Sequence, residues 1–376
     1  MRITSHFDSG SIEVVKADKP SDIQLKIRKD SHSDFLQWFY FRVSGVESEA
    51  LTMHFLNASE TSYPDGWPDY QVVASYDRQE WFRIPTSFDG KVLTAKFTPQ
   101  YNDLYFAYFA PYTVERHLDL IAWAQLSPLC QLSRVCQTVE GRDVDLLQVG
   151  EPGADKAVIW ITARQHPGES MGEWFIEGLL ERLLDEDDPV SRSLLNKSVF
   201  YIVPNINPDG VFHGNLRTNA AGANLNREWQ NPTQEKSPEV FYVRELMHKT
   251  GVDAYLDVHG DEAIPYNFVA GCDEIPGYDA KHKHIQDSFK AFWQEFSPDF
   301  QVKHGYPVAH HQIDEYMTMA TSYIGSTFKC LAYTIEMPFK DNFNLPDPEY
   351  GWSPERCKRF GASVLGALLK VLPELK

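Results

Sequence analysis

The chain has 376 residues, of which 43% are hydrophobic and 13% aromatic, so it can bury two compact cores. Its 35 basic and 53 acidic residues give a formal net charge of -18, which repels phosphate groups and excludes nucleic acid as an expected partner. No window approaches the roughly 18 apolar residues that a membrane span requires, and the first residues lack the apolar segment of a signal peptide. We therefore expect a folded cytoplasmic protein with no membrane partner.

The first hundred or so residues alternate apolar and polar positions over short runs, which is typical of half-buried strands. Such runs cover residues 36–43, 51–56 and 91–97, and clusters of turn residues separate them. No long helical period appears in this part. We expect a small antiparallel β-sandwich over residues 1–115, with the aromatic run at 105–112 in its core.

From about residue 116 the pattern changes to apolar runs that alternate with amphipathic segments, which predicts an α/β fold. The runs are nearly uninterrupted, as expected of strands covered on both faces, and they lie at 157–163, 199–204, 254–258 and 331–335. Ser-Pro-Glu sequences at 237–239 and 353–355 mark helix starts, and a third helix is predicted over 174–184. We expect a mixed, mostly parallel sheet flanked by helices over residues 116–376, packed against the sandwich.

Chemically active side chains follow three of these predicted strands at the point where each strand ends. His166 and Glu169 come after the first strand, His259 comes after the third, and Glu336 ends the fourth. Binding sites of open α/β sheets form at the carboxyl ends of the strands. We therefore expect these four side chains to meet in one crevice.

The spacing of His166, Glu169 and His259 favours a catalytic zinc site. A short spacer on a tight turn lets His166 and Glu169 point at one ion, and His259 arrives much later in the chain. Two histidines and one glutamate leave a fourth position for water, whereas structural zinc sites are closed by four protein groups. The five cysteines are scattered and form no CxxC pair, so they indicate neither a thiolate site nor a disulfide framework. We expect one Zn²⁺ per chain, and we interpret the histidines at 282, 284, 310 and 311 as solvated or packing residues.

Five motifs in order give the chain a family resemblance. They are HPGES at 166–170, NPDG at 207–210, NLNR at 224–227, DVHG at 257–260 and YTIE at 333–336. With them, residues 116–376 resemble the zinc carboxypeptidases of the carboxypeptidase A class. The upstream part resembles the β-sandwich that precedes the catalytic domain in cytosolic carboxypeptidases. The resemblance implies a metallocarboxypeptidase that hydrolyses the C-terminal peptide bond of peptides or proteins.

The roles of individual residues follow from this resemblance and from the needs of amide hydrolysis. Glu336 can take a proton from the attacking water and deliver it to the leaving nitrogen. Arg217 resembles the arginine that supports the oxyanion, and Asn226 with Arg227 resembles the clamp on the substrate's terminal carboxylate. A guanidinium matches a carboxylate with two parallel hydrogen bonds, which would enforce cleavage at a C-terminus.

The chain also departs from the pattern of the digestive carboxypeptidases. Asn224 stands where those enzymes have an aspartate; its amide can accept the imidazole N–H but does not raise the basicity of the ligand. Tyr316 and Tyr323 are both candidates for the tyrosine that covers the substrate. Cytosolic carboxypeptidases are associated with acidic C-terminal residues, and Lys329 is the only basic side chain over 313–330. A preference for glutamate is therefore a hypothesis, which the net charge of -18 opposes.

Two other functions compete with the exopeptidase. A zinc amidase or deacylase acting on N-acyl amino acids would use the same metal site, and its substrate also carries a carboxylate for Asn226 and Arg227. A carboxypeptidase-like protein that only binds its partner should have lost a zinc ligand or the general base. This chain retains His166, Glu169, His259 and Glu336, which disfavours the second alternative.

Overall fold

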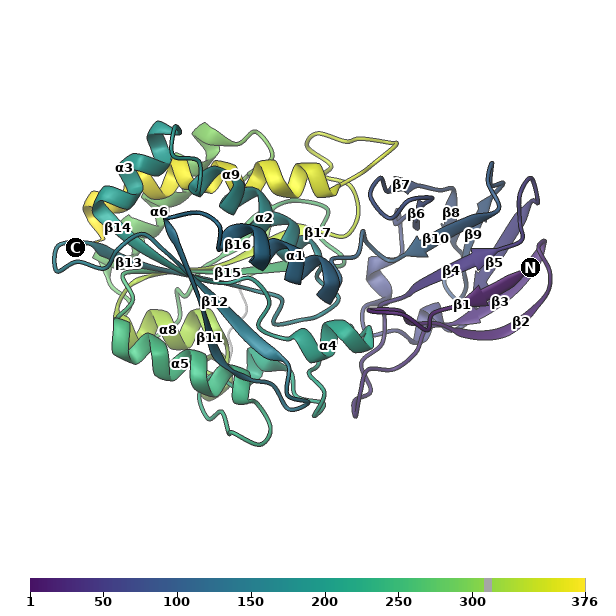
Figure 1. The fold of residues 1–376 in the computed structure, drawn as a ribbon, viewed down its shortest axis with the longest axis horizontal. Coiled ribbons are helices and arrows are strands. Elements are labelled where there is room, and N and C mark those ends of the chain that lie inside the picture. The colour runs from purple at the N-terminus through teal and green to yellow at the C-terminus, as the bar shows by residue number, and fades with distance from the viewer. Residues whose placement is uncertain (308–312, 376) are drawn as a thin grey trace.

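The computed structural model describes residues 1–307 and 313–375, and it places a part made of strands beside a larger α/β part (Figure 1). His310 and His311, which we interpreted from the sequence as solvated or packing residues, lie outside the described residues. His282 and His284 lie on a helix and contact Asp279 and Glu374, respectively.

Two five-stranded sheets pack together in the N-terminal part. The first has the order β1 (Arg2–Thr4), β4 (Tyr40–Ser44), β10 (Asp103–Ala107), β6 (Val73–Ser75) and β7 (Phe82–Arg83). The second has the order β2 (Glu13–Lys19), β3 (Asp22–Lys26), β5 (Leu51–Phe55), β9 (Leu93–Phe97) and β8 (Thr86–Phe88). The predicted antiparallel sandwich is confirmed, with one exception. Strands β3 and β5 pair in parallel, because the chain passes through β4 of the other sheet between them.

A seven-stranded mixed sheet forms the centre of the larger part. Its order is β11 (Cys130–Gln137), β12 (Asp143–Val149), β14 (Ser198–Val203), β13 (Ala157–Ala163), β15 (Ala254–Asp261), β17 (Leu331–Pro338) and β16 (Phe268–Ala270). The four strands predicted from apolar runs are β13, β14, β15 and β17, and they pair in parallel at the centre of the sheet. The outer strands join antiparallel. The predicted mixed α/β fold is thus confirmed.

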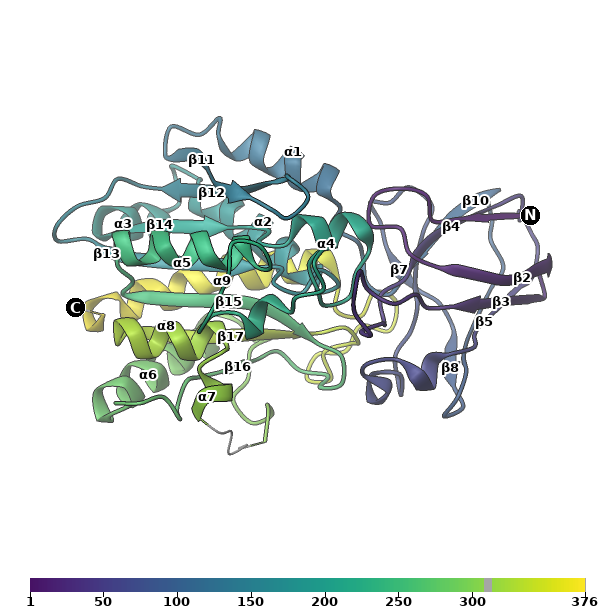
Figure 2. The same ribbon diagram turned by 90° about the horizontal axis from the view of Figure 1, so that it is seen from below.

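Helices cover both faces of this sheet, as Figures 1 and 2 show. One side carries α1 (Val114–Ala124), α2 (Met171–Leu183), α3 (Pro189–Lys197), α6 (Ala280–Phe296) and α9 (Pro354–Val371). The other side carries α5 (Pro238–Thr250) and α8 (Ala320–Phe328). Shorter elements are η1 (Ala58–Glu60), η2 (Pro64–Gly66), α4 (Pro208–His213), η3 (Leu225–Arg227), α7 (Ile313–Tyr316) and η4 (Leu372–Glu374). Among the described residues, no helix combines the length and the apolar character that crossing a membrane would take.

The predicted helix starts are found, although the two Ser-Pro-Glu sequences act differently. Ser353 caps α9, because its hydroxyl accepts the backbone N–H of Arg356. Ser237 precedes α5 but makes no capping hydrogen bond, and its hydroxyl donates to Glu228 at 3.3 Å instead. The third helix starts earlier than predicted, at Met171, so it follows the HPGES motif directly.

One continuous hydrophobic cluster runs from the sandwich into the α2 and α9 side of the large sheet. Where the two parts meet, the ring of Tyr108 stacks on Phe339 with their centres 4.5 Å apart. Beside this contact, the carbonyl of Ala110 accepts hydrogen bonds from Ser170 at 2.9 Å and Trp174 at 3.0 Å. The start of α2 is therefore tied to the segment that leaves the sandwich.

Candidate active site

The carboxyl ends of two neighbouring strands bring His166, Glu169 and His259 together. His166 and Glu169 lie between β13 and α2, and His259 lies in β15. Glu169 Oε1 is 2.7 Å from His166 Nδ1, and Glu169 Oε2 is 2.8 Å from His259 Nδ1. All three side chains are buried, and their possible ligand atoms lie within 4.8 Å of one another. The predicted ligands therefore form one cluster.

The outer nitrogen of each histidine faces an oxygen acceptor. His166 Nε2 is 3.1 Å from Asn224 Oδ1, and His259 Nε2 is 2.8 Å from Asp257 Oδ2. Each acceptor favours the tautomer with its proton on Nε2, which directs the lone pair of Nδ1 to the cluster. Burial, and after it the charge of Arg217, lowers the pKa of His166 to about 4, so this ring is neutral. This donor set fits a zinc ion.

Arg164 holds the loop that carries His166 and Glu169. Its backbone adopts a left-handed conformation with φ of 63°, which a residue other than glycine rarely adopts. Its guanidinium donates two hydrogen bonds to the carbonyl of Pro167, at 3.0 and 2.5 Å, and one to Glu173 at 2.7 Å. These buried contacts offset the backbone strain and fix the loop between the ligands.

Glu336 lies beside the cluster, because β17 pairs with β15 in a register that sets it opposite His259. Its Oε1 accepts a hydrogen bond from the hydroxyl of Tyr306 at 2.9 Å. Its Oε2 is buried and has no hydrogen-bond partner among residues 1–307 and 313–375. Burial raises the pKa of this carboxyl well above its usual range. One oxygen is thus oriented by a tyrosine and the other is available for a proton.

The three predicted substrate contacts lie on two loops. Asn226 and Arg227 belong to η3, where Asn226 Oδ1 accepts the backbone N–H of Ala320 at 2.9 Å. Arg217 lies between α4 and η3. In the part of the chain that the structure describes, neither arginine forms a salt bridge. Burial, and after it repulsion by Arg217, lowers the pKa of Arg227. Two cationic groups close to each other favour an anionic ligand between them.

A single cavity of about 730 Å³ is lined by all seven residues that the sequence predicted to bind the metal, bind the substrate or take part in catalysis. These are His166, Glu169, Arg217, Asn226, Arg227, His259 and Glu336. The same cavity contains residues that the sequence did not indicate, among them Tyr63 from the sandwich and Tyr306. No spacing rule marks either tyrosine, since each arrives from a loop distant in sequence from the motifs.

The structure separates the two tyrosines that we considered as substrate covers. Tyr316 lines the cavity and donates a hydrogen bond to the carbonyl of Gly271 at 3.2 Å. Tyr323 lies elsewhere, with its hydroxyl 3.2 Å from His248. Lys329 also lies outside the cavity: it is exposed, and its ammonium donates to the carbonyl of Pro276 at 3.0 Å.

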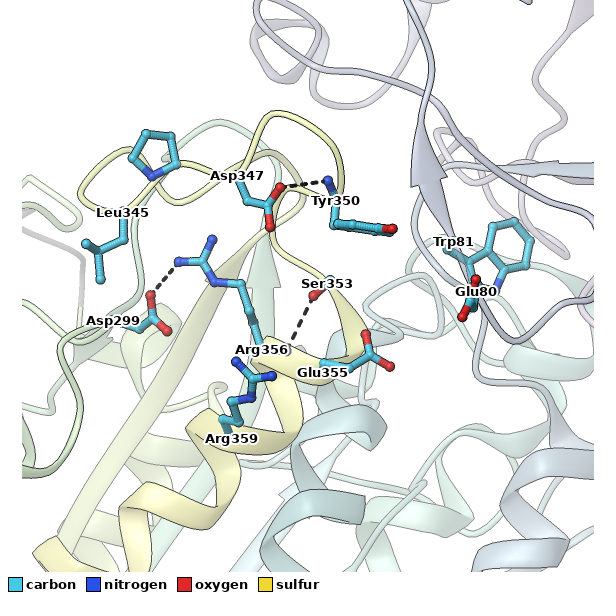
Figure 3. Close-up of a pocket in the computed structure, with 11 residues that line it drawn as sticks. Glu80, Trp81, Asp299, Leu345, Asp347, Tyr350, Ser353, Glu355, Arg356 and Arg359 are labelled. Carbon is cyan, nitrogen blue, oxygen red and sulfur yellow. Dashed lines mark hydrogen bonds and ion pairs between the residues drawn. The ribbon is translucent and has the colours of Figure 1, made fainter.

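A second cavity, of about 620 Å³, lies between the sandwich and the start of α9 (Figure 3). Arg356 projects into it but is paired with Asp299 at 2.5 Å and with Asp341 at 3.4 Å. Trp81 and Glu80 form the opposite wall. This cavity contains none of the predicted metal ligands, and its inner arginine is already neutralised by carboxylates. The chemistry therefore belongs to the first cavity.

Comparison with known families agrees with this geometry. The model of the zinc carboxypeptidase family matches residues 115–354, and that of the cytosolic carboxypeptidase N-terminal domain matches residues 3–109. The chain belongs to the zinc carboxypeptidase family. It is therefore a metallocarboxypeptidase, a hydrolase of a family that acts on peptide or protein substrates. The resemblance inferred from the five motifs is confirmed.

Solved structures and relatives extend this zinc carboxypeptidase assignment over the whole chain. A putative carboxypeptidase from Burkholderia mallei is 49% identical with a TM-score of 0.97, covering 99% of this chain and 97% of that one. A metallo-carboxypeptidase from Pseudomonas aeruginosa, in complex with (2-guanidinoethylmercapto)succinic acid, is 44% identical with a TM-score of 0.96, covering 100% of both chains. Mouse cytosolic carboxypeptidase 6 is 31% identical over 294 residues, which is 70% of this chain. The match spans about half of the mouse protein, 54% of its length.

Proposed function

We propose that this metallocarboxypeptidase removes the C-terminal residue of peptides or proteins. The observation that carries the proposal is the meeting of the metal-ligand cluster, Glu336, Arg217 and Arg227 in one cavity. His166, Glu169 and His259 would hold a single zinc ion. A bound zinc ion supplies a Lewis acid for the scissile carbonyl and lowers the pKa of water to about 7.

The protein's own residues would then bind the substrate and move the proton. Arg227 and the amide of Asn226 would hold the terminal carboxylate, since both line the cavity and Arg227 forms no salt bridge within residues 1–307 and 313–375. Arg217 would stabilise negative charge on the carbonyl oxygen. Glu336 would take the proton of the attacking water on its free Oε2 and release it to the leaving nitrogen.

We also propose a preference for acidic C-terminal residues, which Lys290 rather than Lys329 would recognise. Lys290 lines the cavity and pairs with Asp287 at 2.9 Å, so a substrate carboxylate would have to compete with that aspartate. Asp273 lines the same cavity and favours the opposite preference. The ligand of the Pseudomonas aeruginosa enzyme also carries a guanidino group, which supports basic C-terminal residues as the second candidate.

A panel of matched peptides tests both parts of this proposal. Pentapeptides ending in Glu, Leu or Lys, each with a free carboxylate or a C-terminal amide, are incubated with the purified zinc-loaded protein and analysed by mass spectrometry. We expect loss of one C-terminal residue, no cleavage of the amides, and the highest rate for Glu. Faster release of Leu or Lys would contradict the acidic preference while leaving the exopeptidase intact.

The same experiment also tests the two rival functions, the deacylase and the protein that only binds peptides. Hydrolysis of N-acetyl amino acids without cleavage of any pentapeptide would identify a deacylase. Binding of peptides without turnover, in a protein that contains zinc, would identify a binding protein. The position of Glu336 disfavours the second outcome, because it lies opposite the metal ligand His259 and its Oε2 has no hydrogen-bond partner among residues 1–307 and 313–375, which leaves this oxygen available for proton transfer.

Two further predictions from the sequence stand as proposals. We propose a boundary between the sandwich and the catalytic domain at residues 115 and 116, which lies at the start of the region matched by the zinc carboxypeptidase model, residues 115–354, and after the region matched by the N-terminal domain model, residues 3–109. We also propose a cytoplasmic location. All five cysteines are free thiols, as expected in a reducing compartment.

A further inference from the structure

The loop that carries Arg217 is held in place by a carboxylate from the sandwich. Asp30 Oδ1 accepts the backbone N–H of Leu216 at 2.6 Å, and Asp30 Oδ2 accepts those of Arg217 at 2.7 Å and Thr218 at 3.0 Å. The hydroxyl of Thr218 donates to the same Oδ2 at 3.3 Å. Asp30 is only 6% exposed. Three consecutive backbone amides of the catalytic part thus converge on one carboxylate from the other part.

Residues next to Asp30 fix both ends of this loop. The side-chain oxygen of Asn215 accepts hydrogen bonds from the backbone and hydroxyl of Ser31, at 3.1 and 3.2 Å. Gly222 has a positive φ of 80° and lies so close to His32 that an added Cβ would stand 2.3 Å from its carbonyl oxygen. Only glycine permits this approach without a shift of the backbone.

Two aromatic rings of the sandwich flank the side chain of Arg217. The central carbon of its guanidinium is 5.5 Å from the ring centre of Phe35 and 5.5 Å from that of Tyr63. Such cation–π contacts position a guanidinium without using its hydrogen-bond donors. The Nε of Arg217 is buried and has no hydrogen-bond partner in residues 1–307 and 313–375. The guanidinium is therefore oriented by rings, while its N–H groups stay available to a ligand in the cavity.

We propose that Asp30 is a positioning residue for the peptidase reaction, and that the sandwich, through Asp30, Phe35 and Tyr63, sets where Arg217 meets the substrate. This inference rests on the role proposed above for Arg217. The physical reason is preorganisation: residues 214–223 form a loop rich in glycine, alanine and asparagine, which alone would sample many conformations. A hydrogen-bond donor stabilises a transition state well only when it is already in place.

A double-mutant cycle on kcat for a cleaved peptide tests this inference. Asp30→Asn replaces one acceptor oxygen with an amide that faces backbone N–H donors, so the loop loses its fixed position. We expect Asp30→Asn to lower kcat about tenfold and Arg217→Ala to lower it about a hundredfold. In the Arg217→Ala background, Asp30→Asn should lower kcat by less than about twofold, because its effect is exerted through Arg217. Zinc content is measured for every variant and should not change.

Asp34→Asn is the matched control. It removes a carboxylate from the same segment, but the Asp34 side chain is 95% exposed and forms an ion pair with Lys29 at 2.6 Å. Its kcat should equal that of the wild type. If Asp30→Asn does not fold, the same cycle is run with Phe35→Leu, which removes one ring from a half-buried position and keeps an apolar side chain. We expect about a threefold loss of kcat, again absent in the Arg217→Ala background.

The inference would be overturned if Asp30→Asn, or Phe35→Leu in its place, lowered kcat by the same factor in the wild-type and Arg217→Ala backgrounds. A merely structural effect does not depend on Arg217. An unchanged kcat for the tested variant, with Arg217→Ala impaired, would also overturn it and leave the proposed function standing. An unchanged kcat for Arg217→Ala would instead contradict the role of Arg217 itself.

Discussion

The two sides of the active-site cavity are built in different ways. On the metal side, His259 and Glu336 lie opposite each other on paired parallel strands, and His166 and Glu169 follow the neighbouring strand on a loop that Arg164 holds. On the arginine side, the Arg217 loop depends on hydrogen bonds and rings from the sandwich. The metal side is thus a property of the catalytic fold, whereas the arginine side is shared between two parts of the chain.

Because the two sides are built differently, we expect them to control different steps of the reaction. The metal side would hold the zinc ion and carry the proton, and the arginine side would bind the substrate and stabilise charge. Variants on the first side should therefore alter kcat or metal affinity with little effect on KM, and variants at Arg227 should mainly raise KM. Five changes, taken from the largest expected effect to the smallest, test this division.

Glu336→Gln should have the largest effect. The amide keeps the shape of the side chain but cannot accept a proton from water, so we expect kcat to fall about a thousandfold. Zinc content, measured by atomic absorption, should stay at the wild-type level, since the three ligands are untouched. Full activity in a zinc-loaded Glu336→Gln protein would mean that another group is the base.

His117 contacts Glu173, which pairs with Arg164 on the metal side, and we expect it to make the stability of the protein depend on pH. Its ring nitrogens lie 2.8 Å from Glu173 and 3.2 Å from Asp145, and Glu173 in turn holds Arg164. Burial opposes the charge of His117, but the hydrogen bonds and charges of Asp145 and Glu173 outweigh it and raise its pKa to about 9. The raised pKa contributes stability that is complete below about pH 6.5 and is lost as pH rises through about 9.

We expect this contribution to reach about 3 kcal/mol. Urea unfolding of zinc-loaded wild type and His117→Gln between pH 6 and pH 10 measures it as the difference in the free energy of unfolding. The difference should shrink as pH rises, because His117 loses its proton. A difference that stays constant over this range would show that His117 is not charged in the folded protein.

Arg227→Lys tests the arginine side. Lysine keeps the positive charge but loses the planar fork that binds a carboxylate through two hydrogen bonds. We expect KM to rise about tenfold to a hundredfold for peptides with a free C-terminus, with kcat nearly unchanged. Steady-state kinetics on a peptide of the preferred class measures the two constants. A fall in kcat at constant KM would place Arg227 with the catalytic residues instead.

The sequence predicted the metal side more completely than the arginine side, for a physical reason. Apolar runs located the central strands, and the carboxyl ends of parallel strands meet at one edge, so the position of Glu336 beside the ligands was predictable. Asp30 carried no such signal, because the loop it holds is 186 residues away from it in the chain. The family resemblance indicated Arg217, but nothing in the sequence indicated which residues position it.

The sequence was also a poor guide to which loop residues line the cavity. Lys329 was the candidate for recognising an acidic C-terminal residue, because it is the only basic side chain over residues 313–330. Its backbone is left-handed, with φ of 54°, and its side chain leaves the cavity toward Pro276. Tyr306, which donates a hydrogen bond to Glu336, was not among the tyrosines that the sequence indicated. Backbone conformations of this kind follow from tertiary contacts and leave no periodic pattern in the sequence.

The smallest expected effects concern the residues that orient the two histidine ligands. His259 faces the carboxylate of Asp257, whereas His166 faces the amide of Asn224. A carboxylate raises the basicity of an imidazole ligand, and an amide only orients it. Asp257→Asn should therefore weaken zinc binding about tenfold to a hundredfold, as measured by competition with a chelator.

Asn224→Asp is the reciprocal change and should act in the opposite direction. A carboxylate at this position would make both ligands alike, and we expect zinc affinity to rise about tenfold or less. The gain is the smaller effect, because Asn224 also accepts the backbone N–H of Asn226 and is partly exposed, so solvent screens the added charge. Weaker zinc binding in Asn224→Asp would show that the loop of Asn226 and Arg227 depends on the amide, and that the two sides of the cavity are coupled through this residue.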